Sequence, residues 1–570
     1  MKKRTIAWIA AGALAFYLLM LFILTAAESG ADSAVIHTMR DALWYSLVTL
    51  TTVGYGDLYP VTAAGRWVGA VFSLMSTGLL ALLLGLAVTF VVDKWFPAVY
   101  LALHRNAPWM ILTGPEPLVL ACAANFRRFR EGTVVVVPGD AGAAEDDPDL
   151  QEAGAAPADS AGAAGKILRP SLSVEQILAR KGRKTPVLVC LLGDKEGSNI
   201  AQAIEYRAMT EKMGLSGTIL CRAFRGQVLV PAGIVAFDDE VVSARRFWRA
   251  HGLREEEKKV VVIGPPECAG KILEQGLLMN VFDEGQSVRY DVFGAGTMFL
   301  REHYRLGDGA LTTGENRQER EGDHSDALSG QDGRSVMIAD ETGDRVCMHE
   351  RDWTECPQML QGADRIILCS PDEADNLRVL ATLRMLFNAQ CRIYVRVQHD
   401  LRGVKDQNAF FYGSLSGIYT PEQMLGDSIN ECARRLHGIY CSETNKASAW
   451  EKLNEFQKAS NTSAADHLLE KERILLQDDS ICEVTPGICQ RAAAKWQELT
   501  VDPEQRDRFR KIEHMRWVRF HLLHNWSYAP VRDDAARRRP LLVPFEMLSE
   551  EERQKDDYAW QMLGELYGTQ

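Results

Sequence analysis

The sequence predicts three kinds of structure in one chain: an α-helical membrane domain with two spans and a re-entrant helix, two doubly wound α/β units, and a small, mainly α-helical C-terminal module. Two long apolar runs near the start of the 570-residue chain predict the membrane domain. A strand–turn–helix pattern that occurs twice predicts the α/β units. A change in composition after about Leu436 predicts the last module. The expected boundaries are residues 1–96, 107–250, 258–436 and 442–570.

The first apolar run, Thr5–Ala27, follows three basic residues and holds 23 residues without a charge. It is long enough to cross a hydrocarbon core of about 30 Å as a helix. A cleaved signal peptide also begins with basic residues. The length of the run and a second run at Trp67–Val92 favour membrane spans instead. The positions of the basic residues predict a multi-pass protein of the inner (plasma) membrane, with the N-terminus and the large C-terminal region in the cytoplasm.

Between the two runs, the segment Asp41–Val48 predicts a short helix that re-enters the membrane, and the residues TVGYG follow it. Non-helical backbone at membrane depth is tolerated where it lines a polar path. Carbonyl oxygens of this stretch, with the Thr52 hydroxyl, would replace the water shell of a potassium ion if several chains met on one axis. Gly54 and Gly56 favour the alternating backbone that this needs, because glycine adopts positive φ at little cost.

The motif TTVGYGD, in the order span, re-entrant helix, filter, span, resembles the pore of two-span potassium channels. The resemblance implies K⁺ as the permeant ion, a homotetramer in the membrane, and a selectivity filter made of Thr52, Val53, Gly54, Tyr55 and Gly56. It further implies that Trp44 and Tyr45 support the filter and that Asp57 lies just behind its outer mouth. Many relatives have a hinge glycine where this chain has Ser76. Gly78 and Gly85 remain as candidate gating hinges, or as small residues for helix packing.

In the cytosolic body, the segments PVLVCLLGDKEGSNIAQAIEYRA and DRIILCSPDEADNLRVLATLRML each predict an apolar strand, a polar turn and an amphipathic helix. Glu196 and Asn199 of the first recur as Glu373 and Asn376 of the second, where we expect them to cap the helix starts. Strands that alternate with helices predict a parallel sheet in each unit. Two polar stretches, residues 141–165 and 307–333, predict linkers because they lack the apolar residues of a core.

The repeat and its position after the pore resemble the paired regulator-of-potassium-conductance (RCK) domains of such channels, which are Rossmann-like units. The resemblance implies an eight-unit ring in the tetramer. The turns GPEP (Gly114–Pro117) and GPPECAG (Gly264–Gly270) depart from the glycine-rich dinucleotide fingerprint. Their prolines lack the N–H donors that hold a pyrophosphate, which disfavours a dinucleotide at these turns.

The C-terminal module contains the pattern E-H-x-x-W, W-x-Y, R-D and L-V-P-F between Glu513 and Phe545. This pattern resembles the ryanodine-receptor (RyR) domain, although Asn525 and Ala529 replace two glycines. Aromatic faces beside guanidinium groups suit a flat, anionic small molecule of nucleotide type. The candidate ligand-binding residues are Trp517, Trp526, Tyr528, Arg532, Arg537 and Arg539. The alternative is that the tryptophans pack in a core and the arginines are solvated.

Two functional hypotheses follow. The first is a potassium channel that opens when a small anionic ligand binds the RyR-like module. The second is a potassium channel gated by ions or a dinucleotide at the RCK-like units, with the module as an adaptor for a protein partner. We find no nucleophile–base pair and no metal-ligand pattern, so we expect no catalytic residues, no enzyme activity and no metal site beyond K⁺ in the filter. The net charge of −12 does not favour a nucleic-acid partner.

Overall fold

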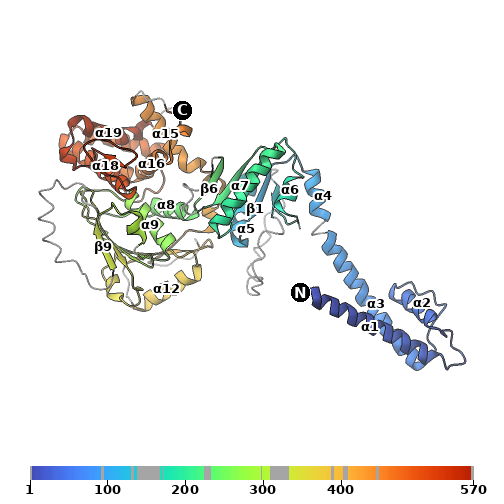
Figure 1. Ribbon diagram of the computed structural model, residues 1–570. Coiled ribbons are helices and arrows are strands. Elements are labelled where there is room, and N and C mark those ends of the chain that lie inside the picture. The colour runs from blue at the N-terminus through green and yellow to red at the C-terminus, as the bar shows by residue number, and fades with distance from the viewer. Residues whose placement is uncertain are drawn as a thin grey trace. The chain divides into compact units, whose positions relative to one another are not determined.

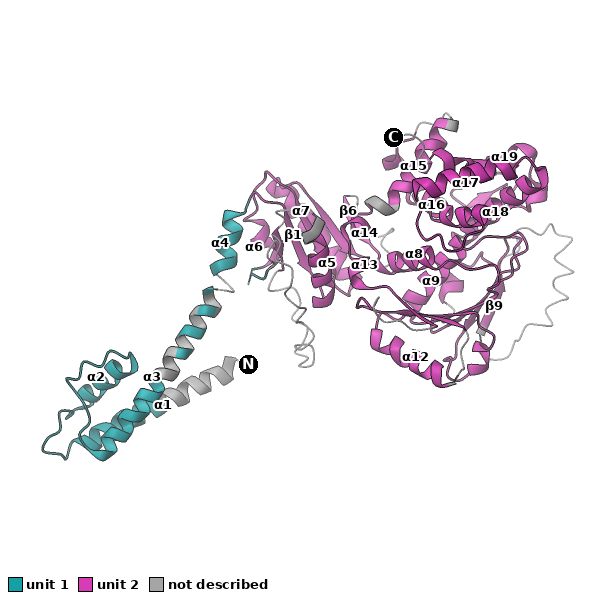
Figure 2. Ribbon diagram, turned by 180° about the vertical axis from the view of Figure 1, so that it is seen from behind, with its two compact units in different colours: residues 1–105, 168–172 teal, residues 106–167, 173–570 magenta. Residues whose placement is uncertain are grey.

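The computed structural model describes residues 3–91, 95–129, 134–137, 167–170, 172–223, 231, 233–296, 298–307, 333–386, 391–401, 408–444 and 448–565 (Figure 1). It divides into two compact units (Figure 2). Unit 1 comprises residues 1–105 and 168–172, and unit 2 comprises residues 106–167 and 173–570. The first expected linker lies outside the described residues, as does the second apart from its end residues.

The described part of unit 1 is helical. Its helices are α1 (Lys3–Glu28), α2 (Met39–Leu50), α3 (Ala63–Phe90) and α4 (Phe96–Leu103). Helix α1 contains the first apolar run, α3 contains most of the second, and α2 contains the segment expected to re-enter the membrane. Across the described residues, no helix combines the length and the hydropathy that a membrane crossing requires.

Two carboxylates hold parts of the backbone of unit 1 in place through hydrogen bonds. Asp41 and Thr38 form a capping box at the start of α2, in which each side chain accepts a hydrogen bond from the backbone N–H of the other. Glu28, at the end of α1, is fully buried and accepts hydrogen bonds from the backbone N–H groups of Val61 and Thr62, both at 3.0 Å. Glu28 therefore fixes the segment that follows the expected filter onto α1.

The first sheet of unit 2 has the strand order β3-β2-β1-β4-β5-β6. The pairs β1–β2, β1–β4, β4–β5 and β5–β6 are parallel. Its strands are β1 (Trp109–Thr113), β2 (Val134–Val136), β3 (Ile167–Leu168), β4 (Val187–Leu191), β5 (Gly217–Arg222) and β6 (Ile234–Phe237). The accompanying helices are α5 (Glu116–Phe129), α6 (Val174–Leu178), α7 (Glu196–Met213) and α8 (Asp239–Ala250).

The second sheet has the order β13-β12-β11-β7-β8-β10-β9, which repeats the topology of the first and adds β9 as an antiparallel edge strand. Its strands are β7 (Lys259–Ile263), β8 (Arg289–Phe293), β9 (Gly333–Met337), β10 (Arg345–His349), β11 (Arg365–Leu368), β12 (Arg392–Arg396) and β13 (Ala409–Tyr412). Its helices are α9 (Pro266–Met279), α10 (Met298–Glu302), the 3₁₀ helix η4 (Pro357–Leu360), α12 (Glu373–Leu386), α13 (Leu415–Ile418) and α14 (Pro421–Met424). Both sheets are doubly wound, which confirms the predicted fold of the two α/β units.

Alternate residues of the central strand β7 explain why helices cover both faces of the second sheet. Val260 and Val262 are fully buried in the core that contains α9, whereas Val261 and Ile263 belong to the core that contains α12. Side chains of a strand alternate between faces, so a strand that is apolar throughout must be covered twice. Figure 1 shows α9 and α12 on opposite faces of this sheet.

The two α/β units exchange helices. Helix α8 follows the first sheet, but Phe247 and Trp248 lie in the core of the second unit, and the Trp248 indole donates to the Ile272 carbonyl at 2.7 Å. Conversely, α13 and α14 follow the second sheet, but Tyr419 after α13 and Met424 of α14 are buried in the core of the first unit. Each α/β unit is therefore completed by a segment that is contiguous in sequence with the other.

The C-terminal part of unit 2 is mainly helical, as predicted. It contains α15 (Asp427–Thr444), η5 (Trp450–Lys452), α16 (Glu455–Leu476), α17 (Pro486–Leu499), α18 (Pro503–Leu523), β14 (Ser527–Tyr528), β15 (Arg538–Arg539), η6 (Phe545–Met547) and α19 (Glu550–Glu565). Val518 and Leu522 of α18 share one core cluster with Val260 and Val262 of β7. The expected boundary near residue 442 falls inside α15, and the C-terminal helices pack directly on the second α/β unit.

The repeated asparagine has a different role from the one predicted. Asn199 of α7 donates two hydrogen bonds, to the carbonyl of Gly193 at 2.7 Å and to that of Arg222 at 2.9 Å. Asn376 of α12 makes the equivalent pair at 2.8 and 2.9 Å. The expectation that these residues cap their helices was wrong, because each one ties the turn before its helix to the end of the next strand.

Candidate pore and ligand sites

The backbone of the expected filter alternates in hand. Thr52, Gly54 and Gly56 have φ of +63°, +59° and +74°, so every second residue of the stretch is left-handed. The N–H groups of Val53 and Gly54 both donate to the carbonyl of Val48, at 3.0 and 3.2 Å, which anchors the stretch to the end of α2. Such alternation turns successive carbonyl oxygens toward one side of the chain, as ion coordination by backbone oxygens requires.

Trp44 supports this stretch in two ways. Its indole Nε1 donates to the Asp57 carboxylate at 2.8 Å, and its ring stacks on Tyr55 with centroids 6.1 Å apart and planes 2° from parallel. Tyr45 points elsewhere, because its ring meets Phe72 of α3 at 6.4 Å. The structure therefore brings Trp44, Tyr55 and Asp57 together, while Tyr45 joins the pore helix α2 to α3.

Helix α3 is continuous through the candidate hinges Gly78 and Gly85. The surroundings of Gly78 lie outside the described residues, and Gly85 is exposed with open space beside it. Close packing occurs instead at Gly65 and Gly69. A Cβ would lie 2.0 Å from the carboxylate of Glu28 at the first position and 2.6 Å from the Tyr45 hydroxyl at the second. The G-x-x-x-G spacing of these two glycines was the available sequence signal for this contact.

The C-terminal candidates divide into a buried group and an exposed group. The Arg539 guanidinium lies 4.7 Å from the ring centre of Trp526 and 5.7 Å from that of Trp517. Trp526 is only 5% exposed and stacks on Phe456 at 5.0 Å, so its ring belongs to the core, which is the alternative that the sequence left open. The structure thus brings together the buried Trp526 and the half-buried Trp517 and Arg539.

The exposed group lies on the loop that carries the short strands β14 and β15, which pair in parallel. Tyr528 is 44% exposed on β14, whose backbone pairs with that of β15. Arg532 is exposed and forms a bidentate pair with Asp534, both contacts at 2.7 Å. Arg537 donates to the carbonyl of His524 at 2.9 Å. These side chains present aromatic and cationic groups to solvent in front of the buried tryptophans.

Asn525 keeps the turn that a glycine forms in the related pattern. Its φ is +60°, a conformation that Asn tolerates better than most residues. Its side chain also donates to the carbonyl of Glu302 at 2.7 Å, in the second α/β unit. This replacement therefore retains the backbone and adds a contact between the module and that unit.

Helix α8 carries three buried ion pairs that sequence reasoning did not identify. Asp239 binds Arg222 at the end of β5 with two contacts of 2.9 Å, and Glu240 binds Arg396 at the end of β12 with contacts of 2.5 and 2.9 Å. Arg245 of the same helix binds Asp466 of α16 with two contacts of 2.7 Å. The available signal was the equivalent position of the two arginines in the repeats CRAF and VRV.

Arg519 makes a second buried junction between the module and the second α/β unit. It is fully buried on α18 and donates to the Asp344 carboxylate at 2.9 Å, to the Thr342 hydroxyl at 2.8 Å and to the Asp340 carboxylate. Burial raises the pKa of Asp344 despite the adjacent guanidinium, which lowers it. Elsewhere in the described residues, no group of three or more His, Cys, Asp or Glu is arranged to hold a metal ion.

Comparison with known families assigns both ends of the chain. A family profile described as "Ion channel" matches residues 5–93, and a profile described as "RyR domain" matches residues 503–565. The chain therefore carries an ion-channel domain at its N-terminus and a RyR domain at its C-terminus.

Two curated relatives match within the channel domain. Human potassium voltage-gated channel subfamily A member 6 is 41% identical over 56 residues, which are 10% of this chain and 11% of that protein. The mouse protein of the same name is 39% identical over 56 residues, with the same shares. The chain thus spans about a tenth of the length of these relatives.

Among solved structures, the chain is similar to the GsuK channel. The structure described as GsuK bound to ADP gives a TM-score of 0.32 at 14% identity, covering 75% of this chain and 98% of that one. The GsuK channel bound to NAD gives 0.30 at 12% identity, covering 74% and 83%. At these TM-scores the likeness supports no argument about this chain.

Proposed function

We propose that the chain is a potassium-selective channel that assembles as a homotetramer in the inner membrane and opens when a small anionic ligand of nucleotide type binds the RyR domain. The observation that carries the proposal is the alternating backbone at Thr52, Gly54 and Gly56, directly after a capped helix and inside an ion-channel domain. One chain contributes one carbonyl oxygen to each level of a filter, so a cage around K⁺ needs several chains. The potassium channels that match this region support the choice of ion.

The orientation follows from Lys2, Lys3 and Arg4, the basic residues before the first apolar run. They favour a cytoplasmic N-terminus, which leaves unit 2 in the cytoplasm, where it is accessible to metabolites. Two α/β units per chain, with their resemblance to RCK domains, suggest a ring of eight units in the tetramer. A shift in such a ring is the means by which ligand binding would open the pore.

The proposed ligand site is the exposed face of the loop that carries β14 and β15, with Tyr528, Arg532 and Arg537 as the groups that meet the ligand. Trp517, Trp526 and Arg539 lie behind this face and hold it in place. A guanidinium binds phosphate with two parallel hydrogen bonds, and Arg532 already presents that fork to the Asp534 carboxylate. An anionic ligand would compete with Asp534 for it.

The coupling from the RyR domain to the rest of unit 2 is supported by buried contacts. Arg245 and Asp466 join the module to α8, and Arg519 joins it to the second sheet. A ligand shifts a conformational equilibrium only by its difference in affinity for the two states. About 1–3 kcal/mol of coupling per site, over four linked chains, suffices for a steep response.

The test uses the full chain, reconstituted in liposomes of pure lipid. We expect K⁺ flux well above Na⁺ flux, a tetramer by native mass measurement in detergent, and flux that rises on addition of one member of a nucleotide panel. A conducting monomer or dimer, or equal K⁺ and Na⁺ flux, contradicts the pore assignment. Selective flux that no nucleotide alters contradicts the ligand assignment and favours a RyR domain that binds a protein partner.

A further inference from the structure

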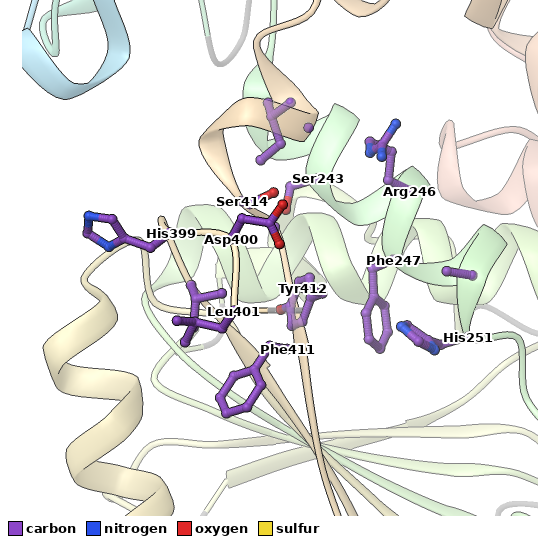
Figure 3. Close-up of a pocket in the computed structure, with 15 residues that line it drawn as sticks. Ser243, Arg246, Phe247, His251, His399, Asp400, Leu401, Phe411, Tyr412 and Ser414 are labelled. Atoms are coloured by element: carbon purple, nitrogen blue, oxygen red, sulfur yellow. The ribbon is translucent and has the colours of Figure 1, made fainter. Parts of the chain in front are cut away.

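A cavity of about 360 Å³ lies between α8 and the second sheet, at the carboxyl ends of β12 and β13 (Figure 3). Its walls include Ser243 and Phe247 of α8, Tyr412 and Ser414 at the end of β13, and Asp400 and Leu401 in the loop after β12. The carboxyl ends of the strands form the edge of an open α/β sheet where ligands bind. The volume falls in the range of small-molecule sites, roughly 300–1,000 Å³.

One polar group in this cavity lacks a protein partner. Ser243 is 3% exposed, and its Oγ has no hydrogen-bond partner in the described part of the chain. A buried hydroxyl without a partner is costly, and native structures nearly always satisfy such groups. Figure 3 shows the Asp400 carboxylate and the Ser414 hydroxyl on the same side of the cavity as Ser243. Together they form a cluster that suits the hydroxyl groups of a ligand.

The opposite wall is apolar and partly aromatic. The rings of Phe247 and Tyr412 pack together with centroids 4.7 Å apart. Phe411 and Leu401 also line the cavity, but they belong to the core on the other face of the sheet. His251 beside them adds no charge at neutral pH, because burial and the cations of Arg365 and Arg473 lower its pKa to about 4. A flat ring packs well against such a surface.

The charges of the wall are balanced. Among the lining residues that the structure describes, Arg246 and Asp400 contribute one charge of each sign, which is fewer cations than a polyphosphate would need. An exposed imidazole at the rim, His399, faces the Glu373 carboxylate at 3.1 Å. This balance distinguishes the cavity from the arginine-rich loop of the RyR domain.

We propose that this cavity is a second ligand site, which binds an uncharged, ring-bearing molecule with several hydroxyl groups, the chemistry of a nucleoside. The ring lies against Tyr412 and Phe247, and the hydroxyl groups pair with Ser243 and Asp400. The site is independent of the RyR domain and of the pore assignment. Because Ser243 is on α8, the ligand contacts the helix that holds Arg222, Arg396 and Asp466 through its ion pairs.

The experiment titrates the full chain in detergent with adenosine, guanosine, cytidine and uridine by calorimetry, and with the four 5′-triphosphates and a panel of free amino acids for comparison. We expect one nucleoside to bind once per chain, and its triphosphate to bind this site at least tenfold more weakly. Ser243→Ala and Asp400→Asn, which change hydrogen bonding but little volume, should each weaken the nucleoside at least tenfold.

A blocking variant and a matched control locate the binding. Ala250 is exposed on α8 and lines the cavity, so Ala250→Trp should abolish nucleoside binding. Ala208 is exposed on α7 and does not line it, so Ala208→Trp should bind as the parent does. Both variants should keep the parental K⁺ flux without ligand, which separates this test from that of the pore. If Ala250→Trp fails to fold, the two conservative variants still decide the question.

Three results overturn the proposal: no nucleoside binds, the nucleoside binds equally well to the Ser243→Ala and Asp400→Asn chains, or the free amino acids bind the cavity in its place. Binding that Ala250→Trp leaves intact also overturns it, since the ligand then lies elsewhere.

Discussion

Arg245 of α8 and Asp466 of α16 form a buried, bidentate ion pair, with both N–O distances at 2.7 Å and side chains 8% and 4% exposed. The same helix pairs with Arg222 of the first sheet and Arg396 of the second. Helix α8 is therefore held by charges from all three parts of unit 2.

Breaking the Arg245–Asp466 pair tests whether it couples the C-terminal module to α8. Asp466→Ala leaves Arg245 buried without its main partner and should cost about 3–5 kcal/mol of stability, measured as a lower melting temperature. Ligand response should be lost while K⁺ selectivity is kept. Asp375→Ala, which removes an exposed pair with Arg378, should cost about 1 kcal/mol or less. A parental melting temperature for Asp466→Ala would show that the pair is dispensable.

Gly54→Ala tests the filter. A Cβ at this position meets nothing within 4 Å, so the cost comes from the φ of +59° alone, about 1–2 kcal/mol against a left-handed backbone. K⁺ flux should collapse, while circular dichroism of the full chain stays unchanged. Flux with unaltered selectivity in this variant would refute the filter assignment.

Trp44→Phe separates the stacking role of Trp44 from its hydrogen bond. The variant keeps an aromatic ring beside Tyr55 but loses the 2.8 Å bond to Asp57, worth about 1 kcal/mol. We expect a lower ratio of K⁺ to Na⁺ flux. Trp67→Phe, at an exposed position of α3, is the control and should keep the parental ratio. An unchanged ratio in both variants would mean that the bond does not support the filter.

Stability should depend on pH through Glu472. Burial raises the pKa of this carboxyl to about 7 from an ordinary value of 4.5. Between these values the folded chain keeps a proton that the unfolded chain has lost, so stability falls as pH rises through this window and stays lower above it. Glu472→Gln should therefore melt about 2 °C or more above the parent at pH 8.

The same gain should disappear at pH 5, where the parent carboxyl is protonated when folded. Glu451→Gln, at an exposed position, is the control and should show no such difference between pH 5 and pH 8. A Glu472→Gln gain that is equal at both pH values would mean that the buried charge is not its cause.

Arg532→Ala tests the ligand site of the RyR domain. Arg532 is exposed and pairs with the nearby, equally exposed Asp534, so its loss should change stability by no more than about 1 kcal/mol. Affinity for the activating nucleotide should fall at least tenfold by calorimetry. Arg378→Ala removes an equally exposed arginine and should leave affinity unchanged. Equal affinity in both variants would show that the ligand binds away from the loop that carries β14 and β15.

The sequence alone predicted the sheets well, because continuous apolar strands such as Val260–Ile263 and a repeated strand–helix pattern specify a parallel, doubly wound fold. The left-handed positions Gly54 and Gly56 were likewise predictable, because only local sterics decide them. The exchange of α8 and α13 could not be predicted, because the sequence of an amphipathic helix does not specify which apolar surface the helix covers.

The burial of Trp526 and the double hydrogen bond of Asn199 depend in the same way on tertiary partners far away in sequence. Phe456, which stacks on Trp526, precedes it by 70 positions and belongs to helix α16. The ion pairs of α8 have the same origin. A carboxylate at a helix start is consistent with a simple cap, and only the folded chain brings Arg222 and Arg396 to it.

The exchange of helices also determines how the protein responds to proteolysis. A protease that cut the connection between α8 and β7 would leave two fragments, each of which holds a helix that fills a groove on the other. The nicked protein should therefore migrate as one particle under native conditions and as two bands in denaturant. For the same reason, neither half is a sound unit for separate expression, because each would expose the apolar groove that its counterpart covers.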